Sequence, residues 1–248
     1  MNLNKYLIIV VKIVQYNLKI IFAGKFIWFL LAAFSFFAFF MFQAAYNRTE
    51  INEGTIYNLL LFPCLLLIFY PVVFGIQNDE DNRILEIIFG IPNYRYKVWG
   101  VRILMVYIAN YFILVIFSYL ANLLLFPVNM FEMAAQLIFP MLFFGNLAFM
   151  FSTIVRSGNG TAVLMIIFGL GFYIFMSTGT QTGGQQQATQ SLSNSMWNVF
   201  INPFTMPSSV HPVVWQETIF QSRILLAISG VVWLLIGLLN LQKRENFV

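Results

Sequence analysis

The chain has 248 residues, of which 60% are hydrophobic and 9% are charged, and its mean hydropathy is +0.81. A soluble domain cannot bury so much apolar surface, so this composition excludes a soluble protein and indicates a polytopic membrane protein. The net charge is +4, and the single cysteine and single histidine exclude an intrachain disulfide and argue against a His/Cys metal site within one subunit.

The first segment, residues 1–24, is basic and periodic. Lys5, Lys12 and Lys19 recur at a helical spacing, with apolar residues on the other sides of the same period. This pattern predicts an amphipathic helix that lies in the membrane interface before the first span. The alternative is an irregular basic leader that only sets the orientation of the chain.

Six continuous apolar stretches follow, and each is close to the roughly 20 residues that a helix needs to cross a bilayer. They cover residues 26–46, 56–77, 98–126, 133–155, 161–180 and 224–241. Because the runs are continuous and do not alternate, they predict helices and not barrel strands. The expected fold class is an all-α polytopic membrane protein, with one transmembrane domain over residues 1–248.

The basic residues are sorted between the two sides that these spans define. All 13 except Arg48 and Arg223 fall in the N-terminal segment, in or just after the second-to-third loop, in the fourth-to-fifth turn or in the tail. The positive-inside rule therefore places both termini in the cytoplasm. It also explains the pI of about 9.2 without a nucleic acid as partner.

The loop at residues 78–97 carries the densest charge in the chain. Asn78 is a candidate N-cap, and the three acids at 79–81 would fill a first helical turn, where carboxylates face the positive end of the helix dipole. Four isoleucines at helical spacing then form one apolar face: Ile84, Ile87, Ile88 and Ile91. We expect a short cytoplasmic amphipathic helix that ends before Pro92. Its acids favour a protein partner over an anionic lipid surface.

Two other regions carry polar or unusual sequence. The external loop at 181–222 contains an aromatic, proline-punctuated part, residues 196–215, which predicts a re-entrant or interfacial segment; an ordinary loop with interfacial aromatic anchors is the alternative. Asn146, near the middle of the fourth span, is a candidate pathway residue, although such residues also bond between helices. No acid or base falls near a predicted midplane, which argues against a proton- or sodium-driven relay.

The charged loop resembles the first cytoplasmic loop of ABC-2 type transporter permeases. Those loops read as an acidic residue, G-T-L-E, an apolar run, P-x-x-R and a glycine near the next span. The matching residues here are Asp79-Glu80, Leu85-Glu86, Pro92 to Arg95, and Gly100. The chain departs from the pattern at the G-T pair, where Arg83-Ile84 stand. A basic N-terminal helix, six spans and Asn202-Pro203-Phe204 before the last span are also similar to the family.

The resemblance implies a permease subunit of an ABC transporter that exports a substrate across the bacterial inner membrane. Such a subunit pairs with a second permease copy and binds two cytoplasmic ABC ATPase subunits. Contact with the ATPase falls on five residues of the loop: Asp79, Glu80, Glu86, Pro92 and Arg95. The chain lacks G-x-x-x-x-G-K-[ST], so ATP and Mg are expected in the partner ATPase, and this subunit is expected to hold no cofactor and no catalytic residue.

Two other functions remain open from the sequence. One is a non-transporting ABC-2-like scaffold that couples an ATPase to envelope machinery. The other is a stand-alone secondary transporter, which would be expected to show midplane charges or an inverted repeat with broken helices. The sequence shows neither of these features clearly.

Overall fold

The computed structural model describes residues 12, 15, 25–46, 51–81, 95–155, 157–178, 201–206 and 210–245, with no side chain described at 80–81, 95–97, 172–178 or 242–245. The centre of the charged loop, most of the external loop and, apart from Lys12 and Gln15, the predicted interfacial helix at 1–24 therefore lie outside the described residues.

The described part of the chain is all helical and contains no strand. Its elements are α2 (Phe26–Tyr46), α3 (Glu53–Val73), α4 (Gly75–Asp81), the π-helix η1 (Arg95–Gly100), α6 (Val101–Leu124), α7 (Met130–Ile154), α8 (Gly158–Thr178) and α10 (Pro212–Glu245). Among these residues, five helical stretches are long and apolar enough to cross a membrane: Phe26–Tyr46, Glu53–Asp79, Val98–Leu124, Met130–Ile154 and Pro212–Leu241. The expectation of an all-α, membrane-compatible fold is confirmed.

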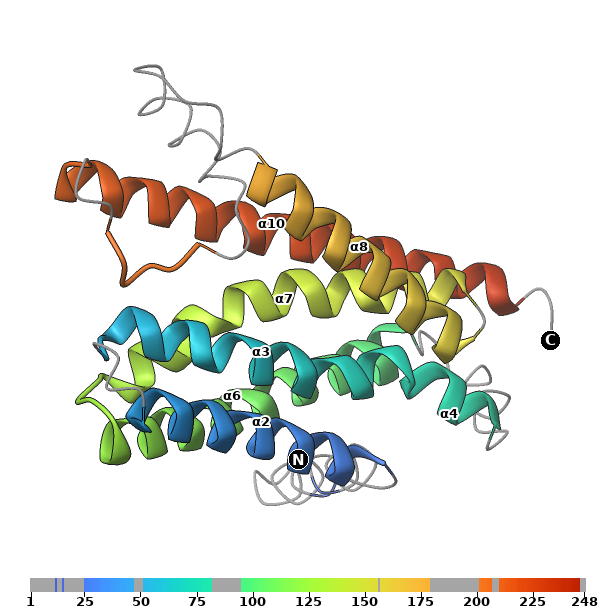
Figure 1. Ribbon diagram of the computed structural model, residues 1–248. Helices are drawn as coiled ribbons and strands as arrows, with labels where there is room; N and C mark the ends of the chain where they lie inside the picture. The colour runs from blue at the N-terminus through green and yellow to red at the C-terminus, as the bar shows by residue number, and fades with distance from the viewer. Residues whose placement is uncertain are drawn as a thin grey trace, which may run out of the picture.

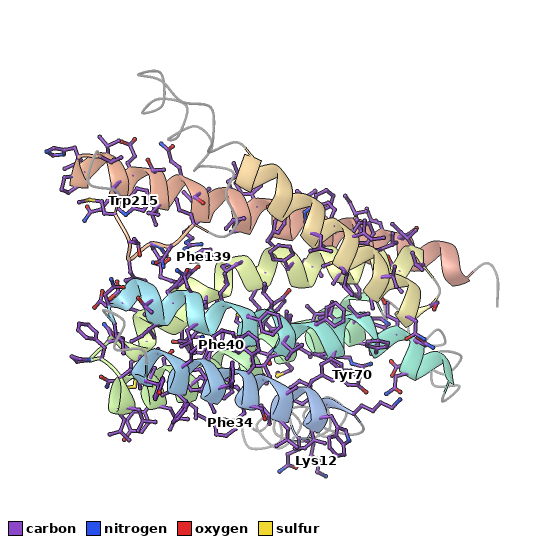
Figure 2. All side chains as sticks on the ribbon, viewed as in Figure 1. Lys12, Phe34, Phe40, Tyr70, Phe139 and Trp215 are labelled. Carbon is purple, nitrogen blue, oxygen red and sulfur yellow. The ribbon has the colours of Figure 1, made fainter. Side chains whose placement is uncertain are left out.

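Successive long helices run in alternating directions, and α7 occupies the centre of the bundle (Figure 1). It packs against α3, α6, α8 and α10, while α2 lies on α3 at the periphery. α7 is the most buried of the five long apolar stretches and α2 the least. Outward-facing side chains are largely apolar, as Phe34 on α2 illustrates (Figure 2), so the surface suits a hydrocarbon environment.

The two ends of the bundle are fixed by different hydrogen bonds. At one end, the Gly158 amide donates to Gln77 Oε1 at 2.6 Å, which ties α8 to α4. At the other end, Asn52 caps α3 by accepting from the Thr55 amide at 2.8 Å. We call these the Asp79 end and the Tyr57 end, after the residues discussed below.

The acids of the charged loop do not begin a helix at Asn78. α4 continues α3 after a break at Phe74, and the Asn78 amide donates to the Phe74 carbonyl at 2.9 Å. Asn78 is therefore inside a helix and is not an N-cap, and the acids at 79–81 fall in the last turn of α4. The second apolar stretch thus extends past its predicted end at 77, because polar residues can prolong a helix whose apolar part is already packed.

The last helix begins earlier than its apolar run indicates. α10 starts at Pro212, so the external loop predicted for 181–222 ends before that residue, and the sixth predicted span at 224–241 is only part of a longer helix. Proline suits a first helical position because its missing N–H has no partner to lose there. The first three turns mix Gln, Glu, Thr and Ser with apolar residues. Their mean hydropathy is therefore too low to mark them as part of an apolar span.

Close contact between α10 and α7 depends on glycine. A Cβ added at Gly237 would lie 2.7 Å from Phe149 Cδ1 and 3.3 Å from the Met150 Cα. At Gly230 it would lie 3.2 Å from the Leu142 carbonyl oxygen. Small residues let helix backbones approach closely in membranes, where packing replaces the hydrophobic effect as the source of association.

We predict that Gly237→Leu lowers the free energy of unfolding by about 1–3 kcal/mol, the usual cost of forcing extra methylenes into a packed site. Gly169→Leu on α8 is the matched control, because a Cβ there meets nothing within 4 Å. SDS-titration unfolding of the full chain in detergent micelles measures both. Equal losses for the two variants would contradict the packing role of Gly237.

Candidate functional site

At the Asp79 end, a buried ion pair joins α4 to α6. Arg102 Nη1 donates to Asp79 Oδ2 at 2.5 Å, and the two residues are only 8% and 4% exposed. The guanidinium also lies 5.0 Å from the centre of the Trp99 ring, in cation–π geometry. This is the one ion pair found among the described residues. It connects the two helices between which the charged loop runs.

The same end is held by bonds to the centre of the bundle. Ser152 Oγ on α7 donates to the Val73 carbonyl at the end of α3, at 3.1 Å. The Lys25 amide, just before α2, donates to Tyr70 Oη at 3.3 Å. The base of the charged loop is therefore fixed to α2, α6 and α7 through α3 and α4.

The predicted ATPase-contact residues are placed only in part. Asp79 is buried and paired inside the protein, so its carboxylate does not face water. Glu80 lies in α4 and Arg95 in η1, without described side chains. Glu86 and Pro92 lie outside the described residues. Sequence reasoning did not pair Asp79 with Arg102; the available signal was an arginine just inside an apolar span, which needs a partner.

Asn146, the candidate pathway residue, is 2% exposed in the middle of α7. Tyr107 Oη on α6 donates to its Oδ1 at 2.8 Å. Gly230 on α10 faces the Asn146 amide nitrogen, 3.5 Å from the position of an added Cβ. Asn146 therefore lies where α6, α7 and α10 meet. This arrangement favours hydrogen bonding between helices, and a pathway role stays a prediction.

At the Tyr57 end, a second buried arginine gathers three parts of the chain. Arg223 on α10 is 4% exposed. Its Nε donates to Gln136 Oε1 on α7 at 3.0 Å, and its Nη2 donates to Tyr57 Oη on α3 and to the Ile201 carbonyl, both at 3.2 Å. The guanidinium also lies 5.7 Å from the Phe139 ring centre, at the α7 position labelled in Figure 2.

The chain around Ile201 lies against the beginning of α3. Asn202 Nδ2 donates to the Gly54 carbonyl at 2.7 Å, while Asn202 Oδ1 accepts from the Phe204 amide at 3.0 Å and closes a local turn. The Phe204 ring centre is 5.9 Å from that of Tyr57. The N-P-F triplet therefore fastens residues 201–206 to α3.

The sequence patterns did not identify Arg223 as a site residue, because it lies just before the predicted sixth span. Its hydrogen-bond partners are far away along the chain, 87 positions for Gln136 and 166 for Tyr57, and only the fold brings them together. No group of three or more His, Cys, Asp or Glu residues among the described positions could hold a metal ion.

A scan against protein-family models and searches of curated proteins and of solved structures find no match for this chain.

We predict that Asp79→Asn lowers the free energy of unfolding by about 3–5 kcal/mol, because it leaves the Arg102 guanidinium buried without its carboxylate. Arg102→Gln strands the Asp79 carboxylate and has a similar effect. The double variant should lose less than the sum of the two single losses, by at least about 1 kcal/mol. SDS-titration unfolding measures the cycle, with Glu217→Gln at an exposed position as the control. Simple additivity would contradict the coupling.

Proposed function

We propose that the protein is the membrane-spanning permease subunit of an ATP-binding cassette exporter. In this arrangement α8 is the fifth of six spans, and the Asp79 end and both termini face the cytoplasm of a bacterial cell. Two copies, or this chain and a similar permease, pair above two cytoplasmic ATPase subunits, which bind ATP and Mg. Support comes from the alternating helices, from the asymmetry of basic residues, and from the resemblance of the 78–97 loop to an ABC-2 coupling loop.

The observation that carries the proposal is the buried Asp79–Arg102 pair at the base of that loop. A loop that receives a push from a partner must be attached firmly to the helices it moves. In a low-dielectric site an ion pair is held strongly in one geometry, and separating it is costly. The pair thus makes α4 and α6 respond together to any displacement of the loop.

Movement at the loop can then reach the opposite end of the protein. α3 and α4 together form a nearly continuous helical stretch of 27 residues, Glu53–Asp79, which spans about 40 Å at 1.5 Å per residue. α3 packs on the central helix α7, and α7 packs on α10. Interfaces of closely packed helices transmit rigid-body shifts.

Within this proposal the residues of the loop divide into two roles. Glu80, Glu86, Pro92 and Arg95 contact the ATPase. Asp79 positions the loop through Arg102 and does not touch the partner, since its carboxylate is buried. This assignment refines the sequence-based one, which treated Asp79 as a contact residue.

We predict that Glu80→Lys with Glu86→Lys abolishes coupling to the ATPase while leaving the fold intact. Two acids that meet a partner surface become repulsive when reversed, and like charges across an interface oppose docking. The full-length tagged protein is purified from its native membranes, and co-purifying proteins that carry a P-loop motif are quantified by mass spectrometry, together with ATP hydrolysis. We expect an ATPase of this kind to co-purify with the wild type. The amount that co-purifies with the double variant should be at least tenfold lower.

Glu53→Lys with Glu217→Lys is the matched control, because it reverses two exposed acids away from the charged loop and should not alter recovery of the ATPase. Unfolding in SDS shows whether each variant keeps its fold. The proposal is refuted if the wild type retains no P-loop ATPase, or if the Glu80/Glu86 variant retains it with undiminished coupled activity.

A further inference from the structure

The two buried arginines are satisfied in opposite ways. Arg102 faces a carboxylate. Arg223 has no carboxylate or other anionic partner within 4.0 Å among the described residues, and all its hydrogen bonds go to neutral oxygens of Tyr57, Gln136 and Ile201. Its Nη1 nitrogen is buried and has no hydrogen-bond partner among the residues that the structure describes. A cation held only by neutral groups, with one nitrogen unsatisfied, is incompletely compensated for its lost hydration.

From this difference we expect the Tyr57 end to open more easily than the Asp79 end. Separating Asp79 from Arg102 would break a charge–charge contact. Releasing Arg223 would break bonds to neutral acceptors, and it would expose to solvent the guanidinium nitrogen Nη1, which is buried in the closed arrangement. The hydration of the guanidinium on opening therefore offsets part of the free energy needed to break its three hydrogen bonds.

The element released would be residues 201–206. Two described hydrogen bonds attach this segment to the bundle: its Ile201 carbonyl accepts from Arg223, and Asn202 donates to the Gly54 carbonyl. The Phe204 ring also contacts Tyr57. Ile201, at the beginning of the segment, is 5% exposed, whereas Met206 at its end is 44% exposed. In Figure 1 the segment runs alongside the first part of α10 and close to the beginning of α3.

We propose that Arg223 is a latch that holds residues 201–206 closed over the Tyr57 end of the bundle and releases them reversibly. The latch spans three helices, since one guanidinium bonds to α3 and α7 from α10. Its opening uncovers Ile201 and the guanidinium together. This inference goes beyond the proposed coupling to an ATPase and does not depend on it.

Gly54 provides a second, independent way to disturb the latch. A Cβ at this position would collide with Thr205 Oγ1 and lie 3.2 Å from Asn202 Nδ2. Gly54→Ala therefore pushes the segment away from α3 without changing Arg223. Adding Thr205→Ala removes the oxygen of the collision and should let the segment return.

Cysteine labelling tests the latch in the full-length protein in detergent micelles. Ile201→Cys reports opening of the segment, and Met206→Cys is the exposed reference. The native Cys64 is buried, so the unmodified protein supplies the background. We expect a hydrophilic maleimide to label Ile201→Cys at least tenfold more slowly than Met206→Cys. Arg223→Gln and Gly54→Ala should each accelerate the Ile201→Cys reaction at least tenfold, and Thr205→Ala should reverse most of the Gly54→Ala effect.

The Met206→Cys rate separates a latch from a general loss of structure. In a latch, Arg223→Gln and Gly54→Ala leave that rate within about twofold, while the Ile201→Cys rate rises. The proposal is overturned if neither variant accelerates Ile201→Cys labelling, or if both probes accelerate equally. Should Arg223→Gln fail to fold, the Gly54→Ala and Gly54→Ala/Thr205→Ala pair decides the question alone.

Discussion

A charge buried among apolar helices must find its partner inside the protein, and this constraint organises both ends of the bundle. Arg102 and Arg223 are almost completely buried, so each guanidinium bonds to groups from other segments of the chain. Arg102 gathers α4, α6 and Trp99, and Arg223 gathers α3, α7, α10 and the chain at Ile201. Each cluster therefore fixes tertiary structure that apolar packing alone would leave less specific.

Between these clusters, close packing of the helices around α7 holds the centre of the bundle together. α7 is enclosed by α3, α6, α8 and α10, and it meets α10 where Gly230 and Gly237 leave room for its backbone and for Phe149. The polar contacts described near this centre are neutral: Tyr107 donates to Asn146, and the Cys64 thiol donates to the Leu137 carbonyl. Such bonds add modestly to stability in membranes. Close packing therefore stabilises the middle of the bundle, and the buried charges fix the structure of its two ends.

The sequence predicts the helices far better than it predicts the contacts between them. α2 covers residues 26–46, as the uninterrupted apolar run indicates, because a stretch without polar residues has clear limits. The helices that contain the apolar runs at 56–77 and 224–241 extend beyond those runs, to Asp81 and back to Pro212, because the added residues are polar or amphipathic and their composition overlaps with that of loops. Arg223 could not be assigned at all, because its role depends on Tyr57 and Gln136, which are distant along the chain.

One helical stretch joins the two clusters. Tyr57 lies near the beginning of α3 and Asp79 lies in α4, so the same continuous stretch bonds to Arg223 at one end and to Arg102 at the other. Pro63 and Pro71 lie between them, and each removes a backbone donor and loosens the helix at its own turn. Under the proposed function, a displacement that enters at the Asp79 end would travel along a helix able to bend, towards an end where Arg223 is held by neutral acceptors. Under the latch proposal, the attachment at Arg223 would yield before the ion pair at Asp79.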